Sequence, residues 1–312
     1  MSEQILSVFP IHMREKLKKT LETTRVEELR VRVNRPFVLR TQAQDYFWDI
    51  QSGQCITSPG QAYFITEKDI SDMLTFLSRY SIYAYEEELK SGYLTLEGGH
   101  RVGVAGHVLM ENGHVGKMSR ITFLNIRIAQ EYKGCAEQIY PYLLKHDRMY
   151  HTLLLSAAGI GKTTYLRDLI RLLATGDGQH APLRVGVVDE RSEIAAGYMG
   201  IPQHDVGIHT DVMDGCSKPC GMLMLLRSMA PQVIAVDELG GEADFLAVEQ
   251  VLNCGCSILG TIHAADINEM MQKTRLKGWL EQEIFERFIV LEYGEKNCRK
   301  ISVYDEKLEQ LC

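Results

Sequence analysis

Short runs of alternating apolar and polar residues, separated by turn signals, fill the first half of the chain. These runs predict strands at residues 28–33, 37–40, 93–96, 101–105 and 124–128. A helix is predicted after Thr66, because Asp69 completes a capping pair with it and apolar residues then recur at helical spacing as far as Leu77. We therefore expect residues 1–147 to form a smaller, mixed α/β domain.

Beyond residue 150, longer apolar strands alternate with helical segments. The strands are predicted at residues 152–155, 184–188, 232–236, 257–262 and 288–291, and the helices at residues 163–174, 221–229 and 242–252. This alternation is typical of an α/β fold whose parallel sheet is covered on both faces. We expect residues 148–312 to form this second domain, with ligands beyond the carboxyl ends of its strands.

The clearest chemical motif follows the first of these strands, where residues 156–163 read SAAGIGKT and lead into an amphipathic helix. A triphosphate needs backbone N–H groups around its β-phosphate and a lysine that bridges the β- and γ-phosphates. We assign the second role to Lys162 and expect the Thr163 hydroxyl to ligate Mg²⁺. The expected nucleotide contacts are Ser156, Ala157, Ala158, Gly159, Ile160, Gly161, Lys162, Thr163 and Thr164.

One position of this loop departs from the usual P-loop pattern, since Ser156 replaces the first glycine. The neighbouring residues are small, so we expect Ser156 to hold the turn without a positive φ. A chance Gly-Lys-Thr at a strand-to-helix turn is the alternative. The apolar strand before the loop, the helix after it and an acid pair downstream all favour a phosphate site.

That acid pair is Asp237 and Glu238, at the end of another apolar strand. We expect Asp237 to hold Mg²⁺ through water and Glu238 to orient or polarise the attacking water. An ordinary solvated acid pair is the alternative. Residues 237–240 also match the D-x-x-G motif of GTPases, but no N-K-x-D motif that would recognise guanine occurs in the chain, which favours ATP.

Two further strand ends carry candidate catalytic residues. Asp189 and Glu190 follow one strand, and His263 ends another. Because ligands of a parallel sheet lie at this edge, we expect all three beside the phosphates, with His263 sensing the γ-phosphate. A purely structural histidine is the alternative.

Composition narrows the class of protein. With 45% apolar and 24% charged residues, the chain is typical of a soluble globular protein, and its net charge of -7 disfavours nucleic-acid binding, although a local basic patch remains possible. No run reaches the ~18–20 apolar residues of a membrane span, and the amino terminus lacks the features of a secretion signal. We expect a cytoplasmic protein without a membrane span of its own.

The eight cysteines are expected to be reduced thiols, because no secretion signal precedes them. Two pairs, Cys216/Cys220 and Cys254/Cys256, raise the alternative of a four-cysteine zinc site. Neither pair has the usual two-residue spacer, so buried or partly buried thiols are favoured.

Taken together, these motifs resemble the stage III sporulation protein AA family, ATPases of endospore-forming bacteria related to type II and type IV secretion ATPases. The resemblance covers roughly residues 25 to 305. It is carried by the segments at residues 78–106, 124–129, 161–171, 187–216, 227–240 and 260–269, which include GKTTYLRDLIR, RSMAPQVIAVDELG and GTIHAADINE. Serine at position 156 is also similar to the family pattern.

This resemblance implies a RecA-like P-loop NTPase domain and a ring, taken as a homo-hexamer, in the mother-cell cytoplasm. The ring would act beneath membrane-embedded proteins of a sporulation transport complex, at the membrane periphery. It also implies that Asp189 and Glu190 correspond to the acidic box and His263 to the histidine box of secretion ATPases. Arg127, and next Arg120, resemble arginines of the first domain that reach the nucleotide; Arg101 is a weaker match. Surface arginines on strands are the alternative.

Two other functions remain as hypotheses. A RecA-like core also serves nucleic-acid motors and loaders, but the acidic balance and the lack of a basic, aromatic-rich stripe disfavour that reading. A nucleotide-gated binding module with little turnover is the second. We expect a Mg²⁺-dependent ATPase, in which an arginine from the first domain stabilises charge as the γ-phosphate is transferred.

Overall fold

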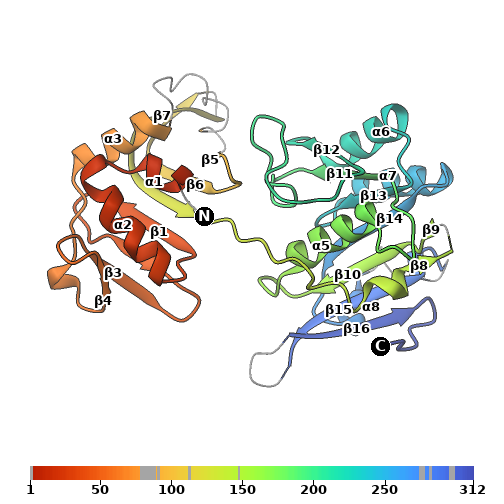
Figure 1. Ribbon diagram of the computed structural model, residues 1–312. Helices are drawn as coiled ribbons and strands as arrows, with labels where there is room; N and C mark the ends of the chain where they lie inside the picture. The colour runs from red at the N-terminus through yellow and green to blue at the C-terminus, as the bar shows by residue number, and fades with distance from the viewer. Residues whose placement is uncertain are drawn as a thin grey trace. The chain divides into compact units, whose positions relative to one another are not determined.

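The computed structural model describes residues 3–77, 89, 92–111, 114–146, 148–273, 278–280, 283–294 and 299–312. The chain forms two compact units, residues 1–130 and 131–312 (Figure 1), and each is described by itself. Residues 131–147, which the sequence placed with the first domain, lie in the second unit. Ala136, Ile139 and Leu143 are fully buried in its core. Most of the segment at residues 78–91, which carries part of the family resemblance, lies outside the described residues.

Unit 1 combines helices with an antiparallel sheet. Its helices are α1 (Glu3–Val8), α2 (Ile11–Thr23) and α3 (Glu67–Leu77). Its strands are β1 (Glu28–Arg32), β2 (Val38–Arg40), β3 (Asp45–Asp49), β4 (Gln54–Ile56), β5 (Tyr93–Thr95), β6 (Arg101–Glu111) and β7 (His114–Arg127). They lie in the order β4-β3-β2-β1-β7-β6-β5.

Alternation along β1 shows how unit 1 divides its sheet into two faces. Leu29 and Val31 are fully buried and pack in one core with residues of α2 such as Met13 and Leu17. The alternate residues Glu28, Arg30 and Arg32 stay partly exposed on the other face. The helices therefore cover one face of the sheet and leave the other to polar and basic side chains.

Unit 2 contains a seven-stranded sheet that is parallel except at one edge. Its strands are β10 (Thr152–Ser156), β11 (Val185–Asp189), β12 (Thr210–Asp214), β13 (Val233–Val236), β14 (Ser257–His263), β15 (Arg287–Tyr293) and β16 (Arg299–Asp305). They lie in the order β12-β11-β13-β14-β10-β15-β16, and only β16 runs antiparallel to its neighbour. A separate hairpin joins β8 (Leu144–Lys145) to β9 (Arg148–Met149).

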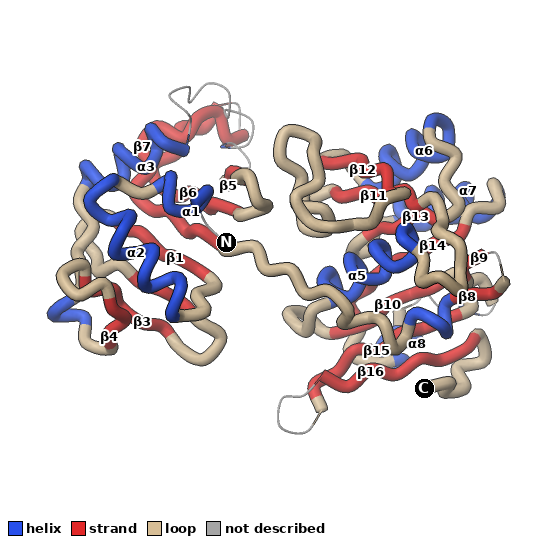
Figure 2. Tube along the Cα trace, viewed as in Figure 1, coloured by secondary structure: helices blue, strands red, loops and turns tan. Residues whose placement is uncertain are grey.

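Helices pack on both faces of this sheet (Figure 2). They are α5 (Lys162–Thr175), α6 (Lys218–Ser228), α7 (Glu242–Asn253) and α8 (Ile267–Gln272). Residues of α5 belong to one buried cluster and residues of α6 and α7 to another, so the sheet lies between two apolar layers. The central strands β10, β11 and β13 are buried throughout because both of their faces are covered, as the apolar runs predicted.

Among the described residues, no helix combines the length and apolar character needed to cross a membrane. In the same part of the chain, no group of three or more His, Cys, Asp or Glu side chains is arranged to hold a metal ion. Of the two cysteine pairs considered above, Cys256 is buried, Cys216 is half-buried, and Cys220 and Cys254 are exposed.

Candidate nucleotide site

The P-loop connects the end of β10 at Ser156 to the start of α5 at Lys162. Gly159 and Gly161 turn the loop with φ values of 80° and 112°, a conformation that glycine adopts without steric cost. The Lys162 side chain folds back over the loop, with Nζ 3.1 Å from the Ser156 carbonyl oxygen and 3.4 Å from that of Ala157. Ser156 is fully buried and holds its turn without a positive φ, as predicted.

Asp237 joins the P-loop helix to two strands. Its Oδ2 accepts a hydrogen bond from Thr163 Oγ1 at 2.7 Å. Its Oδ1 accepts from the hydroxyl of Thr261, a fully buried residue of β14, and from the backbone N–H of Glu238 at 3.1 Å. A hydroxyl and a carboxylate are oxygen ligands of the kind that Mg²⁺ prefers, so Thr163 and Asp237 fit a magnesium site.

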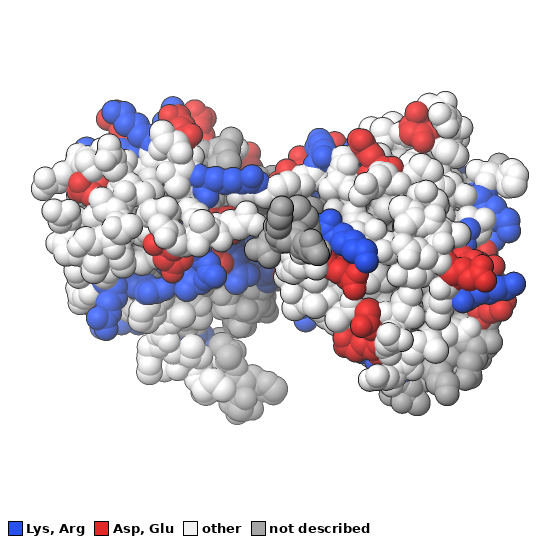
Figure 3. Space-filling model, turned by 90° about the horizontal axis from the view of Figure 1, so that it is seen from below, with Lys and Arg blue, Asp and Glu red and all other residues white. Residues whose placement is uncertain are grey.

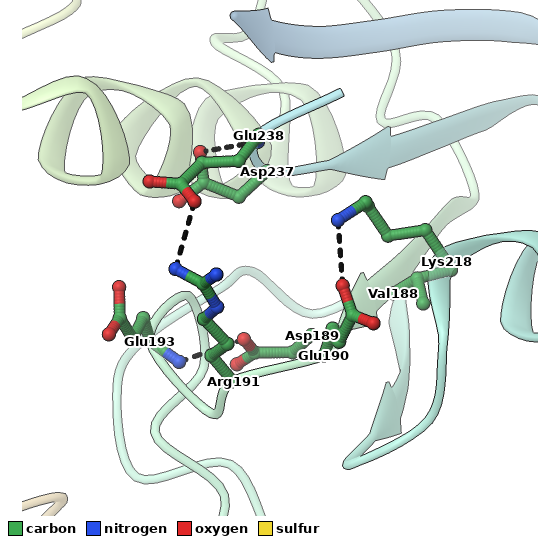
Figure 4. A pocket seen from close by; sticks show the side chains of 8 residues that line it. All are labelled: Val188, Asp189, Glu190, Arg191, Glu193, Lys218, Asp237 and Glu238. Atoms are coloured by element: carbon green, nitrogen blue, oxygen red, sulfur yellow. Dashed lines mark hydrogen bonds and ion pairs between the residues drawn. The ribbon is translucent and has the colours of Figure 1, made fainter. Parts of the chain in front are cut away.

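The carboxylate of Glu238 contacts two side chains, one at each of its oxygens. Its Oε1 lies 2.8 Å from His263 Nε2. Its Oε2 accepts a hydrogen bond from Arg191 Nη1 at 2.9 Å, which Figure 4 shows. Burial tends to raise the pKa of Glu238, but the hydrogen bond from His263 and the charge of Arg191 outweigh it, so the pKa lies below its usual value. The residue adopts a φ of 54°, a strained conformation for a side chain of this size that is common at functional sites.

His263 links Lys162 of the P-loop to this glutamate. Its Nδ1 lies 3.0 Å from Lys162 Nζ. Because an ammonium group can only donate, Nδ1 must accept, and the proton of a neutral imidazole then lies on Nε2, which donates to Glu238. Burial lowers the pKa of Lys162, although the nearby carboxylates oppose that change. The sequence placed these groups at one sheet edge, and the structure brings them into direct contact.

Asp189 lies at the end of β11, and its carboxylate oxygens accept hydrogen bonds from backbone N–H groups. Its carboxylate is 2% exposed and accepts the N–H groups of Glu193, Ile194 and Ala195 at 2.8, 3.0 and 2.8 Å. Burial raises its pKa, although these three donors act in the opposite direction. Arg167 of α5 donates to the carbonyl oxygens of Ile194 and Glu193 at 2.5 and 2.6 Å. The loop after β11 is therefore fixed to the P-loop helix.

Glu190 follows Asp189 and pairs with Lys218 at the start of α6, at 2.6 Å. Figure 4 shows this pair beside the Arg191–Glu238 pair, across a small pocket. The pocket is lined by Val188, Asp189, Glu190, Arg191, Glu193, Lys218, Asp237 and Glu238. Both glutamates are thus held by a cation, but only Glu238 also contacts the lysine–histidine pair described above.

The arginines of unit 1 lie on its sheet. Arg127 ends β7, where its Nε is 3.4 Å from Glu28 and its cross-strand neighbour on β6 is Arg101. Arg120 lies further along β7 and pairs with Glu67 at 3.0 Å, with both side chains exposed. Lys and Arg side chains form a band across unit 1 in Figure 3. Arg101 and Arg127 therefore belong to one row of the sheet, and Arg120 does not.

Sequence reasoning missed several residues of the site. Thr261 orients Asp237 and the backbone of Glu238, and its hydroxyl in an otherwise apolar strand was the available signal. Arg191 lies directly after the Asp-Glu pair, but nothing in its spacing indicates contact with Glu238. Lys273, at the end of α8, donates to the backbone oxygen of His263. Such contacts depend on loop conformation, which sequence patterns do not determine.

The sheet order, the P-loop between β10 and α5 and the acids at the neighbouring strand end define a RecA-like P-loop NTPase fold preceded by a smaller mixed α/β unit. Solved structures with this fold include the ATPase DotB of Legionella pneumophila, with a TM-score of 0.62 and 15% identity, over 95% of this chain and 81% of that chain. The pilus retraction motor PilT with bound ADP matches with a TM-score of 0.57 and 14% identity, over 97% and 82%.

A narrower relationship comes from the sequence. The family profile described as Sporulation stage III, protein AA matches residues 1–311. Stage III sporulation protein AA of Bacillus subtilis (strain 168) is 39% identical over 304 residues, which cover 97% of this chain and 94% of that protein. The chain belongs to the Sporulation stage III, protein AA family.

Proposed function

We propose that this protein is a Mg²⁺-dependent ATPase that works as a motor for a sporulation transport complex. One observation carries the proposal: Lys162, Thr163, Asp237, Glu238 and His263 converge on one sheet edge through contacts of 2.7 to 3.0 Å. This set supplies a cation for the phosphates, oxygen ligands for a metal and a carboxylate for water. When bound, Mg²⁺ would neutralise phosphate charge and orient the triphosphate.

The roles of the individual residues follow from their contacts. Lys162 would exchange its carbonyl and His263 partners for the β- and γ-phosphates. His263 would then lose its Nδ1 contact, so occupancy of the P-loop would be communicated to Glu238. We assign Glu238 to the attacking water and Asp189 to fixing the loop after β11, because its oxygens already accept three N–H groups.

Unit 1 would supply the remaining charge. We propose that Arg127, with Arg120 as the second candidate, contacts the γ-phosphate as charge develops on it, as the resemblance to secretion ATPases suggests. A ring of six copies would let this arginine act within its own chain or on a neighbouring copy. Membership of a sporulation family supports a place in the mother cell beneath membrane-embedded partners.

Phosphate release by the full-length protein tests the proposal. Wild-type protein with Mg²⁺ and ATP should release phosphate steadily, and Lys162→Ala should abolish both ATP affinity and release while remaining folded. Arg127→Ala should retain ATP but lose at least about tenfold in turnover, since arginines supplied to P-loop sites are worth roughly 10³–10⁵ where the contact is complete. Lys117→Ala, also on β7, is the control for loss of charge.

Two outcomes would contradict the proposal. Absence of turnover in wild-type protein that binds ATP would favour a nucleotide-gated binding module. Strong stimulation by single-stranded nucleic acid would favour a nucleic-acid motor. Mixing Arg127→Ala with Lys162→Ala protein then locates the arginine, because recovery of activity in the mixture requires it to act between chains.

A further inference from the structure

Besides Lys162, a second cation of unit 2, Arg299, lies beside the P-loop, on the opposite side from His263. Strand β15 runs parallel to β10, so both end at the carboxyl edge of the sheet, with Leu291 opposite Ser156. The antiparallel strand β16 begins at that same edge with Arg299, which pairs with Tyr293. The topology therefore returns the chain to the phosphate side of the sheet and places a guanidinium group there.

The guanidinium lies directly over the loop. A Cβ atom built on Gly161 would lie 3.3 Å from both Cζ and Nη2 of Arg299. The Arg299 Cζ is also 6.0 Å from the ring centroid of Tyr165, which is 5% exposed on the first turn of α5. Arg299 therefore faces the glycine that precedes Lys162 and borders the same helix turn that carries Thr163 and Thr164.

Gly161, which Arg299 faces, belongs to the loop that we propose holds the phosphates. Glycine is needed in such loops because the backbone approaches the phosphates closely, and a side chain at Gly161 would extend toward Arg299. Lys162 Nζ instead lies close to the Ser156 carbonyl oxygen and to His263 Nδ1, at 3.1 and 3.0 Å. The two cations thus border the loop from different sides, with Lys162 nearer the groups that we assign to the γ-phosphate.

Arg299 and Lys300 differ in their ion-pair partners. Lys300, the next residue of β16, has its Nζ 3.8 Å from a carboxylate oxygen of Glu292. Within the described part of the chain, no carboxylate forms such an ion pair with Arg299. The one acid of α5, Asp168, pairs with Arg171 at 2.8 Å and accepts the N–H groups of Gly134 and Ala136 at 3.1 and 2.8 Å.

We propose that Arg299 binds the α- and β-phosphates of the nucleotide, opposite Lys162, with Tyr165 supporting the guanidinium. This inference rests on the proposed ATP site and adds a residue to it. Because ADP and ATP share these two phosphates, Arg299 stabilises both nucleotides and acts on binding rather than on the chemical step. A planar guanidinium is suited to two phosphate oxygens at once.

Calorimetric titration of full-length protein with MgADP and with MgATP tests this role. Arg299→Ala should weaken both nucleotides about tenfold or more, since hydrogen bonds to charged groups correspond to about ten- to a hundredfold in affinity. Arg299→Lys should recover part of the loss, because it keeps the charge without the fork geometry. Lys300→Ala should bind like wild type and is the matched control for loss of a charge on β16.

Several results would overturn the assignment. Unchanged or tighter binding of both nucleotides by folded Arg299→Ala would show that the guanidinium only packs on Tyr165, in which case its melting temperature alone would fall. A loss confined to ATP would place Arg299 at the γ-phosphate instead. If Arg299→Ala failed to fold, Arg299→Lys and Arg299→Gln would provide the comparison. Wild-type protein that binds neither nucleotide would instead refute the proposed function itself.

Discussion

The ends of β11 and β13 carry the same sequence pattern and have different surroundings. At both ends a buried valine, Val188 or Val236, is followed by Asp-Glu, and the two valines lie opposite each other in the sheet. Asp189 accepts three backbone N–H groups, whereas Asp237 accepts the hydroxyls of Thr163 and Thr261 and one backbone N–H, that of Glu238. The N–H groups that bind Asp189 are part of the loop backbone, so this contact fixes the loop. The hydroxyl groups that bind Asp237 can rotate, so they can rearrange around a metal ion.

The two glutamates that follow these aspartates, Glu190 and Glu238, also differ in their surroundings. Glu190 meets Lys218 on the rim of the pocket, while Glu238 meets His263 and, through it, the lysine of the P-loop. An Asp-Glu pair at a strand end therefore says where a carboxylate lies but not what it does. The donors around each oxygen decide between fixing a loop and binding a metal or a water molecule.

Exchange of each aspartate for alanine should separate these two functions most strongly. Asp237→Ala should weaken Mg²⁺-dependent ATP binding by at least about a hundredfold and leave the unfolding free energy within about 1 kcal/mol of wild type. Asp189→Ala should lower the free energy of unfolding by about 3 kcal/mol, since it leaves two buried N–H groups and one partly buried N–H group without their acceptor. Urea unfolding and ATP titration with and without Mg²⁺ measure both quantities.

The comparison would fail if the results were reversed. Loss of Mg²⁺-dependent affinity in Asp189→Ala that is still folded would mean that its oxygens leave the backbone to reach the metal. Asp189→Asn provides a second variant of nearly the same shape should the alanine variant be too unstable to study.

A smaller effect is expected at the cations that hold the two glutamates. Arg191→Ala should change turnover at saturating ATP by about threefold to tenfold and leave ATP affinity unchanged, because it removes a partner of Glu238 at 2.9 Å. Lys218→Ala, which removes the partner of Glu190, should alter turnover less than about twofold. Equal effects of the two variants in phosphate-release assays would show that Glu190 contributes to the reaction as well.

The sequence predicted the second unit well because its strands are buried on both faces and read as apolar runs. The edge strands β12 and β16 were missed, since half-buried sequences such as Thr210–Asp214 carry a weak pattern. Helix α2 was missed because it begins after Pro10 without a side-chain cap. Residues 131–147 were assigned to the first domain because the strand-like pattern near residue 128 gives no sign that Ala136 and Ile139 pack elsewhere.

At the site, the sequence located the residues that follow strands, because parallel strands bring their carboxyl ends to one edge. It grouped Asp189 with the catalytic residues, since the strand-end pattern is the same as at Asp237. The contacts of Arg191 and Arg299 arise from a loop and from an antiparallel return, and neither has a periodic signature. These contacts follow from the distances around each charged atom in the structure, which the sequence pattern does not contain.

The most direct test of the distinction between the two strand ends is a paired measurement on Glu238→Gln and Glu190→Gln in the full-length protein. Each variant keeps its shape and changes one carboxylate to an amide. We predict that Glu238→Gln binds MgATP with nearly wild-type affinity and releases phosphate at least about a hundredfold more slowly, as loss of a residue that acts on the attacking water requires. Glu190→Gln should remain within about threefold of wild type. Wild-type turnover by Glu238→Gln, or a greater loss in Glu190→Gln, would contradict the account.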